Sequence, residues 1–262
     1  MAAALFAAMG CDGFVVQSAG LAAWPGSAAS EHAITVTGIH DHTSQQATAE
    51  LLEQADVIIC LARGHALQIA PFVPHEKIRV LGGGVADPFG GSLGDYRAYA
   101  AQIQAALPSL LPDIRCTANI IPANPSHIPT IAQLEQVVFS HAASELKLHE
   151  KLALDTCHML TALLDDEIVG FVIVDEIAGE AFIDDLAVFP AFWHQGVASK
   201  LLARAELAAI LRGCTKMHLE VRESNTPARK LYEQRGYTQV GRRKNYYQNP
   251  RKDAILYTLE FR

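Results

Sequence analysis

Prolines are concentrated at one place in the chain, and this concentration divides the sequence into two parts. Five of the twelve prolines fall in one short stretch, at positions 108, 112, 122, 125 and 129. Each proline fixes its φ angle and removes a backbone hydrogen-bond donor, so a cluster of prolines interrupts regular structure. With 262 residues, the chain is also long for one domain. We therefore predict two domains, at 1–111 and 118–262, joined by a linker at 112–117.

The composition argues against several classes of protein. Half of the residues are hydrophobic and 19% are charged, which is typical of a globular protein with an ample core. The net charge of −7 argues against a general nucleic-acid binder, whose affinity comes from neutralising phosphates. No apolar run approaches the length of about 18 residues that a membrane span needs. The apolar start at 1–11 lacks the basic residues of a secretory signal.

The cysteines predict the compartment. They stand at positions 11, 60, 116, 157 and 214, an odd number without a C-x-x-C pair. This pattern fits reduced thiols in the cytosol better than a disulfide framework or a zinc site. His40 and His42 flank Asp41, but no further ligands follow at metal-like spacing. We therefore predict a cytoplasmic protein without a metal site.

In the first half, strand-like and helical patterns alternate. Apolar runs at 13–20, 55–62 and 77–83 predict buried strands, and residues 44–54 and 92–107 carry helical spacing. Alternation of this kind is typical of a parallel sheet covered by helices.

Three features of this half occur in a specific order: Ser18–Ala19–Gly20 followed by Trp24, the segment 38–65, and DPFGGS at 87–92. In these features the half resembles the low-molecular-weight protein tyrosine phosphatases and their arsenate-reductase relatives. The resemblance implies a flavodoxin-like parallel sheet, with Asp87 at the position of the general acid.

The nucleophile of that family has no counterpart in the sequence. Its chemistry needs a cysteine and an arginine separated by five residues, so that a thiolate can attack phosphorus within a cradle of donors. The residues six positions after the cysteines are Gln17, Ala66, Pro122, Leu163 and Glu220. The resemblance places the start of the chain within the first helix of the family, after the phosphate loop. We therefore expect a truncated phosphatase-like domain without activity, in which Asp87 is a turn residue bonded to nearby backbone. Phosphatase or arsenate-reductase chemistry using Asp87 is the alternative.

The second half predicts a helical segment followed by a β-rich unit. The expected elements are a helical segment at 130–153, two strands within 167–190 joined at 178–180, a helix at 196–212, a strand at 216–221, a helix beginning at 225, and a strand at 254–261. The helix that begins near Gly196 should expose several free backbone N–H groups at its N-terminus, which is the positive end of the helix dipole. This arrangement suits a pyrophosphate, although a plain strand–helix turn would look similar.

Three segments, DDLAVFPAFWHQGVASKLL (184–202), HLEVRESNTPARKLYEQRGY (218–237) and GRRKNYY (241–247), together resemble the GNAT superfamily of acyl-CoA N-acyltransferases. Within that superfamily they are similar to the ribosomal-protein-alanine N-acetyltransferases. The resemblance covers about 118–262 and implies an α/β fold with a mixed sheet. It further implies acetyl-CoA as co-substrate and a protein or peptide N-terminus, such as that of a ribosomal protein, as acceptor. No direct nucleic-acid or membrane contact is expected.

The resemblance also assigns site residues. Cofactor contacts are implied for Leu186, Ala187, Val188, His194, Gln195, Gly196, Val197, Ala198, Ser199 and Asn225. Glu220 would be the general base and Tyr232 the general acid. For these two residues the alternatives are a solvated strand-end carboxylate and a half-buried packing ring.

Two positions depart from the family pattern. Trp193 stands where the family usually has Gln or Arg, and residues 141–144 replace a frequent Pro-Trp-Ser of the peptide groove. We therefore expect altered cofactor affinity and an acceptor preference that the sequence does not name.

Overall fold

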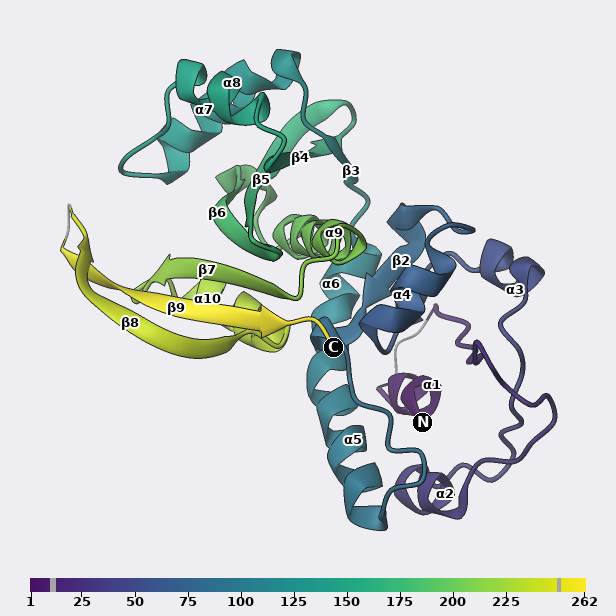
Figure 1. Cartoon of the computed structure of the whole chain (residues 1–262). Helices are drawn as coiled ribbons and strands as arrows, with labels where there is room; N and C mark the ends of the chain where they lie inside the picture. Colours follow the sequence, from purple (N-terminus) through teal and green to yellow (C-terminus); the bar gives the residue numbers. More distant parts are fainter. Residues whose placement is uncertain (10–12, 249–250) are drawn as a thin grey trace. The chain divides into compact units, whose positions relative to one another are not determined.

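The computed structural model describes residues 1–9, 13–248 and 251–262. It forms two compact units, one of residues 1–108 together with Arg262, and one of residues 109–261 (Figure 1). Among the described helices, none combines the length and apolar character needed to cross a membrane.

The first unit contains a parallel pair of short strands and several helices. The strands are β1 (Ile58–Cys60) and β2 (Ile78–Val80). The helices are α1 (Ala2–Ala7), α2 (Glu31–Thr37), α3 (Ala49–Gln54), α4 (Arg63–Ile69), α5 (Leu93–Ala106) and the 3-10 turns η1 (His75–Lys77), η2 (Leu81–Gly83) and η3 (Leu107–Ser109). The strands predicted within 55–62 and 77–83 are confirmed.

The prediction of a buried strand at 13–20 is wrong. Residues 14–19 belong to no strand, and Val15 is almost fully exposed. Gly20 alone makes an isolated bridge, to Gln46. An apolar run becomes a buried strand only where a neighbouring strand satisfies its backbone groups, and the described residues provide no such neighbour here.

The second unit is built on one mixed sheet of seven strands in the order β3-β4-β5-β6-β7-β9-β8. The strands are β3 (Asn119–Pro122), β4 (Cys157–Leu164), β5 (Glu167–Ile177), β6 (Glu180–Val188), β7 (Lys216–Arg222), β8 (Thr238–Tyr247) and β9 (Lys252–Glu260). The pairing of β6 with β7 is parallel, whereas the other described strand pairs of this sheet are antiparallel. The sequence patterns found β5, β6, β7 and β9 but missed β3, β4 and β8. Strand β8 was missed because its side chains are mostly polar and exposed.

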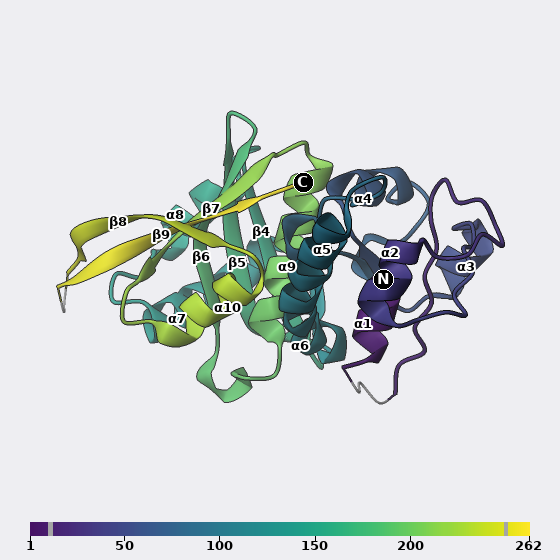
Figure 2. The ribbon, with the colours of Figure 1, turned by 90° about the horizontal axis from the view of Figure 1, so that it is seen from below.

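Helices cover both faces of this sheet. They are α6 (Leu110–Arg115), η4 (Pro125–His127), α7 (Ile128–Val138), α8 (Glu145–Leu152), η5 (Pro190–Phe192), α9 (Val197–Leu211) and α10 (Thr226–Gln234). Figure 1 shows α7 and α8 on one side of β4, β5 and β6, with α9 on the other. Seen from below in Figure 2, the β8–β9 hairpin extends away from these strands. The predicted helical segment at 130–153 is therefore two helices separated by a loop at 139–144.

The segment predicted as a linker at 112–117 is largely helical. It overlaps α6, and Pro112 lies in the first turn of that helix, where a backbone N–H has no intrahelical acceptor. Helix α6 packs against α9. Lys200 Nζ donates to the Cys116 carbonyl at 2.7 Å, and Ser199 Oγ donates to the Ser109 carbonyl at 3.3 Å. Pro112 thus lies within a short helix that packs against α9.

The described cysteines, Cys60, Cys116, Cys157 and Cys214, are free and buried. Burial raises the pKa of both Cys60 and Cys157 to about 12, so these two thiols stay protonated at neutral pH. Cys11 lies outside the described residues. A protonated buried thiol is a small hydrophobic group and a poor nucleophile.

Candidate active site

The centre of the mixed sheet opens where β6 and β7 separate. Their parallel pairing runs from Glu180 opposite Lys216 to Ile183 opposite Leu219. Beyond Ile183, β6 continues to Val188 without pairing to β7 (Figure 1). Backbone N–H and C=O groups on this side of β6 therefore lack the partners that a continuous sheet would supply.

The predicted strand contacts lie on this unpaired stretch. Leu186, Ala187 and Val188 pair on their other side with β5. Trp193 closes back onto the stretch, because its indole Nε1 donates to the Val188 carbonyl at 2.7 Å. Trp193, which departs from the family pattern, is therefore hydrogen-bonded to β6.

Helix α9 begins shortly after the unpaired end of β6. Gly196 is the N-cap residue with φ 80°, and His194 before it has φ 61°. The first described helical bond runs from the Lys200 N–H to the Gly196 carbonyl at 2.9 Å, and no side chain caps the helix. The N–H groups of residues 197–199 therefore have no intrahelical acceptor and point out at the positive end of the dipole, as an anion site requires.

Two side chains of the predicted phosphate cradle are occupied elsewhere. The Ser199 hydroxyl is buried and bonded to the Ser109 carbonyl, and the Gln195 amide donates to the Ala191 carbonyl at 3.2 Å. What this loop offers to a ligand is mainly its backbone.

Gly196 is required by the close approach of α6. A Cβ at this position would lie 2.0 Å from the Pro112 carbonyl oxygen, in addition to the strain of the positive φ. We expect Gly196→Ala to lower the free energy of unfolding by about 2–4 kcal/mol, combining the left-handed backbone cost with overpacking. Chemical denaturation of the full chain measures this loss.

The matched control for that variant is Gly179→Ala. Gly179 also has φ 80°, but no atom of the described residues lies within 4 Å of its added Cβ. Its loss should be about 1–2 kcal/mol, the backbone cost alone. Equal losses in the two variants would show that the Pro112 contact does not constrain the loop.

Glu220 lies on β7, beyond the point where β6 and β7 part. Its Oε1 is 3.1 Å from Arg243 Nη2. Its Oε2 is buried and has no hydrogen-bond partner among the described residues. The charge of Glu220 is also the largest cause that raises the pKa of the Tyr246 hydroxyl. The carboxylate is thus anchored through one oxygen and can accept a proton at the other.

Tyr232 lies on α10 and is 7% exposed. Its ring meets Tyr237 edge to face, with centroids 5.6 Å apart, and lies 6.3 Å from Tyr257. Burial raises the pKa of the Tyr232 hydroxyl far above neutral, so the group holds its proton. Among the described residues, this hydroxyl forms no hydrogen bond, so it remains available as a donor.

Helix α10 begins at Asn225, whose side-chain oxygen accepts the Ala228 N–H at 3.3 Å. The proline in the first turn suits this position, as the sequence predicted. The cap uses one lone pair of the amide oxygen of Asn225, so its NH₂ group and the second lone pair remain for a ligand.

Sequence reasoning missed several charged and aromatic residues beside Glu220. Arg222 donates to Ser140 Oγ at 2.7 Å and stacks over the Tyr247 ring at 4.5 Å. Tyr247 Oη in turn donates to the Glu220 carbonyl at 3.4 Å. The pairing of a polar strand with the 139–144 loop carries no periodic signal, so only the fold reveals it.

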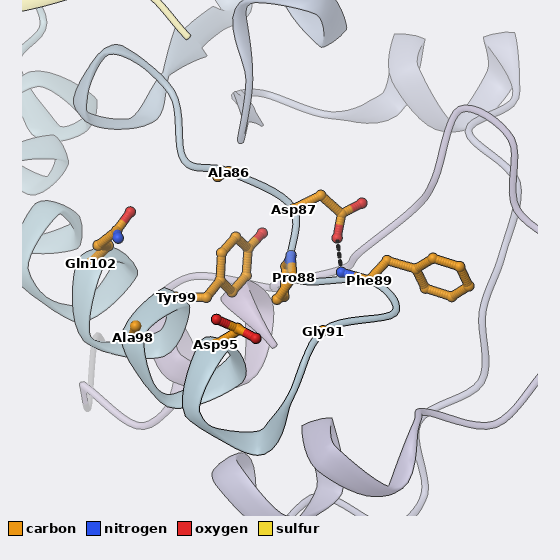
Figure 3. A pocket seen from close by; sticks show the side chains of 9 residues that line it. All are labelled: Ala86, Asp87, Pro88, Phe89, Gly91, Asp95, Ala98, Tyr99 and Gln102. Atoms are coloured by element: carbon orange, nitrogen blue, oxygen red, sulfur yellow. Dashed lines mark hydrogen bonds between the residues drawn. The ribbon is translucent and has the colours of Figure 1, made fainter.

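In the first unit, Asp87 lies at a pocket also lined by Tyr99 and Asp95 (Figure 3). Its Oδ1 accepts the Phe89 N–H at 3.0 Å, the local bond expected of a turn aspartate. Burial, with the charge of Asp87 as a second cause, raises the pKa of Tyr99 to about 12. No described thiol in this unit is a competent nucleophile, because the Cys60 thiol is buried and protonated.

Comparison with known proteins finds a different family in each half of the chain. Residues 128–237 match the Acetyltransferase (GNAT) family, and residues 1–119 match the Low molecular weight phosphotyrosine protein phosphatase family. The [Ribosomal protein bS18]-alanine N-acetyltransferase of Haemophilus ducreyi is 43% identical over 97 residues, which cover 36% of this chain and 67% of the relative. The Haemophilus influenzae enzyme of the same name is 35% identical over 100 residues, covering 37% and 68%.

A solved structure shows the same arrangement of the second unit. The crystal structure of the ribosomal-protein-S18-alanine N-acetyltransferase from Escherichia coli aligns with a TM-score of 0.52 and 26% identity. The alignment covers 55% of this chain and 94% of that one.

Proposed function

The chain belongs to the GNAT family and is an N-acetyltransferase with acetyl-CoA as co-substrate, and on this premise we propose that it acetylates a protein N-terminal α-amino group. The observation that carries the proposal is the separation of β6 and β7 between the uncapped start of α9 and the carboxylate of Glu220. We propose residues 118–262 as the catalytic domain and 1–111 as a separate domain, joined through 112–117.

The residues present fit acetyl-CoA. The N–H groups at the start of α9 would hold the pyrophosphate, and the loop of His194, Gln195 and Gly196 would contribute backbone. The unpaired edge of β6 at 186–188 would hydrogen-bond the pantetheine arm, and the NH₂ group of Asn225 would contact the cofactor. When bound, the co-substrate supplies the acetyl thioester.

Glu220 and Tyr232 would carry the proton transfers. An α-amino group has a pKa of about 7.7–8.0 and is mostly protonated at neutral pH, so it needs a base. Glu220 Oε2 would remove this proton, and the amine nitrogen would then form a bond to the thioester carbonyl carbon. A backbone N–H near Val188 would stabilise the oxyanion. As the C–S bond breaks, Tyr232 would donate its proton to the departing sulfur. The nitrogen would lose its second proton, which returns the tyrosinate to its neutral form, leaving an amide and a free thiol.

The relatives suggest the acceptor. Their names specify the alanine of ribosomal protein bS18, and we propose an alanine-initiated ribosomal protein as the acceptor of this chain too. Buried free thiols support action in the cytoplasm.

The proposal predicts a strong effect of Glu220→Gln. Thiol release from acetyl-CoA with an alanine-initiated peptide should fall by about 10²-fold or more at pH 7, because the amine loses its proton acceptor. The deficit should shrink toward pH 9, where the free amine predominates without help.

Glu223→Gln is the control for that measurement. Glu223 is also paired with an arginine, Arg242, at 3.0 Å, but it lies just after the end of β7. Its activity should stay near that of the unsubstituted chain. Full activity in Glu220→Gln would overturn the assignment of the base.

A further inference from the structure

Strand β6 carries two adjacent carboxylates at the point where it leaves β7. The register against β5 shifts there, so that Ile183 pairs with Val174 and Asp185 pairs with Ile173. Asp184 is the extra residue of this bulge and accepts an ion pair from Lys151. Asp185 is half-buried, and among the described residues its carboxylate forms no hydrogen bond or ion pair.

Asp185 faces α7. Ala187, two residues further along β6, belongs to the core that includes Ile131 and Leu134 of α7. Residues two apart in a strand share a face, so Asp185 points to the same side.

Helix α7 presents a buried carboxylate to this side of the sheet. Glu135 is 2% exposed, and its Oε2 accepts the Ala143 N–H at 3.1 Å. Its Oε1 is buried without a hydrogen-bond partner among the described residues. A buried oxygen of this kind costs free energy unless a donor reaches it.

The charge of Glu135 acts on Asp185. Burial and then the charges of Glu135 and Asp184 raise the pKa of Asp185 to about 7, and burial raises the pKa of Glu135. Lys147 and Lys151 on α8 act in the opposite direction. Lys151 is already shared between two other aspartates, Asp175 and Asp184, and within the described parts of the chain neither Asp185 nor Glu135 forms an ion pair.

The pair lies beside the proposed chemistry. Asp185 immediately precedes Leu186, the first strand position proposed to hold the thioester arm. Burial raises the pKa of Tyr247 to about 12, and the charges of Glu220 and Asp185 add to this shift. The Glu220 and Asp185 carboxylates therefore both act on the hydroxyl of Tyr247.

From this geometry we propose that Asp185 and Glu135 form an anionic subsite that receives the protonated α-amino group of the acceptor peptide. The subsite rests on the proposed function and deepens it, since it selects a free N-terminus over a blocked one. An ammonium group brings three donors, which suits the unpaired Asp185 carboxylate and the free Oε1 of Glu135. Glu220 then removes the proton from an amine already placed at the edge of β6.

The test is a comparison of two ligands on the full chain saturated with CoA, which cannot support transfer. Calorimetry measures the affinity for an alanine-initiated peptide and for the same peptide with an acetylated N-terminus. The unsubstituted chain should prefer the free amine by about tenfold or more, as charge-assisted hydrogen bonds imply. Asp185→Asn should reduce this preference below about threefold and leave the affinity for the acetylated peptide unchanged. Glu135→Gln should reduce it partly.

Asp184→Asn is the matched control, because its carboxylate is adjacent but already paired with Lys151. It should keep the preference. An unchanged preference in Asp185→Asn, or equal affinities for the two peptides in the unsubstituted chain, would overturn the subsite. If Asp185→Asn does not fold, Asp185→Ser is measured in its place, with the same expectation.

A second measurement separates failure of the subsite from failure of the proposed function. It is thiol release by the unsubstituted chain with the same peptide and acetyl-CoA. Its absence would contradict the proposed function. Turnover together with an unchanged preference in the Asp185 variant would contradict the subsite alone.

Discussion

Tyr232→Phe is expected to lower kcat for acetyl transfer by about 10²-fold or more while CoA binding stays intact. The variant removes one hydroxyl that is held protonated by burial and forms no hydrogen bond with the described residues. The departing sulfur then has no placed proton donor. Single-turnover thiol release measures the chemical step, and titration with CoA measures binding.

The control for this prediction is Tyr237→Phe. Tyr237 packs against Tyr232, but its hydroxyl contacts Met217 Sδ at 3.1 Å. Removing this hydroxyl should change kcat by no more than about twofold, the range of a substitution away from the reacting atoms. Full activity in Tyr232→Phe would show that another group protonates the thiol.

Glu206→Ala is expected to lower the free energy of unfolding of the second unit by about 3–5 kcal/mol. Glu206 on α9 and Arg235 at the end of α10 are both almost fully buried and form a two-bonded ion pair, with Arg235 Nε 3.0 Å from Glu206 Oε1. Arg235 Nη1 also donates to Ser199 Oγ at 3.3 Å. Loss of Glu206 leaves a guanidinium buried without its carboxylate. Denaturant unfolding of the full chain, followed with a probe in the second unit, measures the loss.

Two comparisons make this prediction specific. Replacing both partners, as Glu206→Leu with Arg235→Met, should recover most of the lost stability, because no uncompensated charge remains. Lys216→Gln, which breaks an exposed pair with Glu260, should cost about 0–1 kcal/mol. A loss below 1 kcal/mol in Glu206→Ala would show that the buried pair does not hold α10 to α9.

The parts of the fold that the sequence predicted well are those with local causes. The capping asparagine and proline at 225–227 start α10, and the glycine at 196 precedes α9, because the backbone conformation at each position favours these residue types. Strands β5 and β7 were found because their buried apolar residues follow a strand pattern. The error at 13–20 and the unexpected helix within 112–117 have a cause in common. Whether an apolar or proline-containing segment becomes strand, helix or linker depends on what packs beside it.

The candidate site likewise has some features with local causes in the sequence and others that depend on packing. Sequence by itself determined the family, the acetyl-CoA chemistry and the choice of Glu220 and Tyr232 as candidates, since these follow from contiguous motifs. Only the tertiary structure brought Glu135 of α7 to Asp185 of β6, fifty positions apart. It also determined that Lys151 pairs with Asp184 and that Asp185 has no ion-pair partner among the residues described. Burial and pairing depend on distances in space, and a carboxylate has the same sequence signature whether it is paired, buried or free.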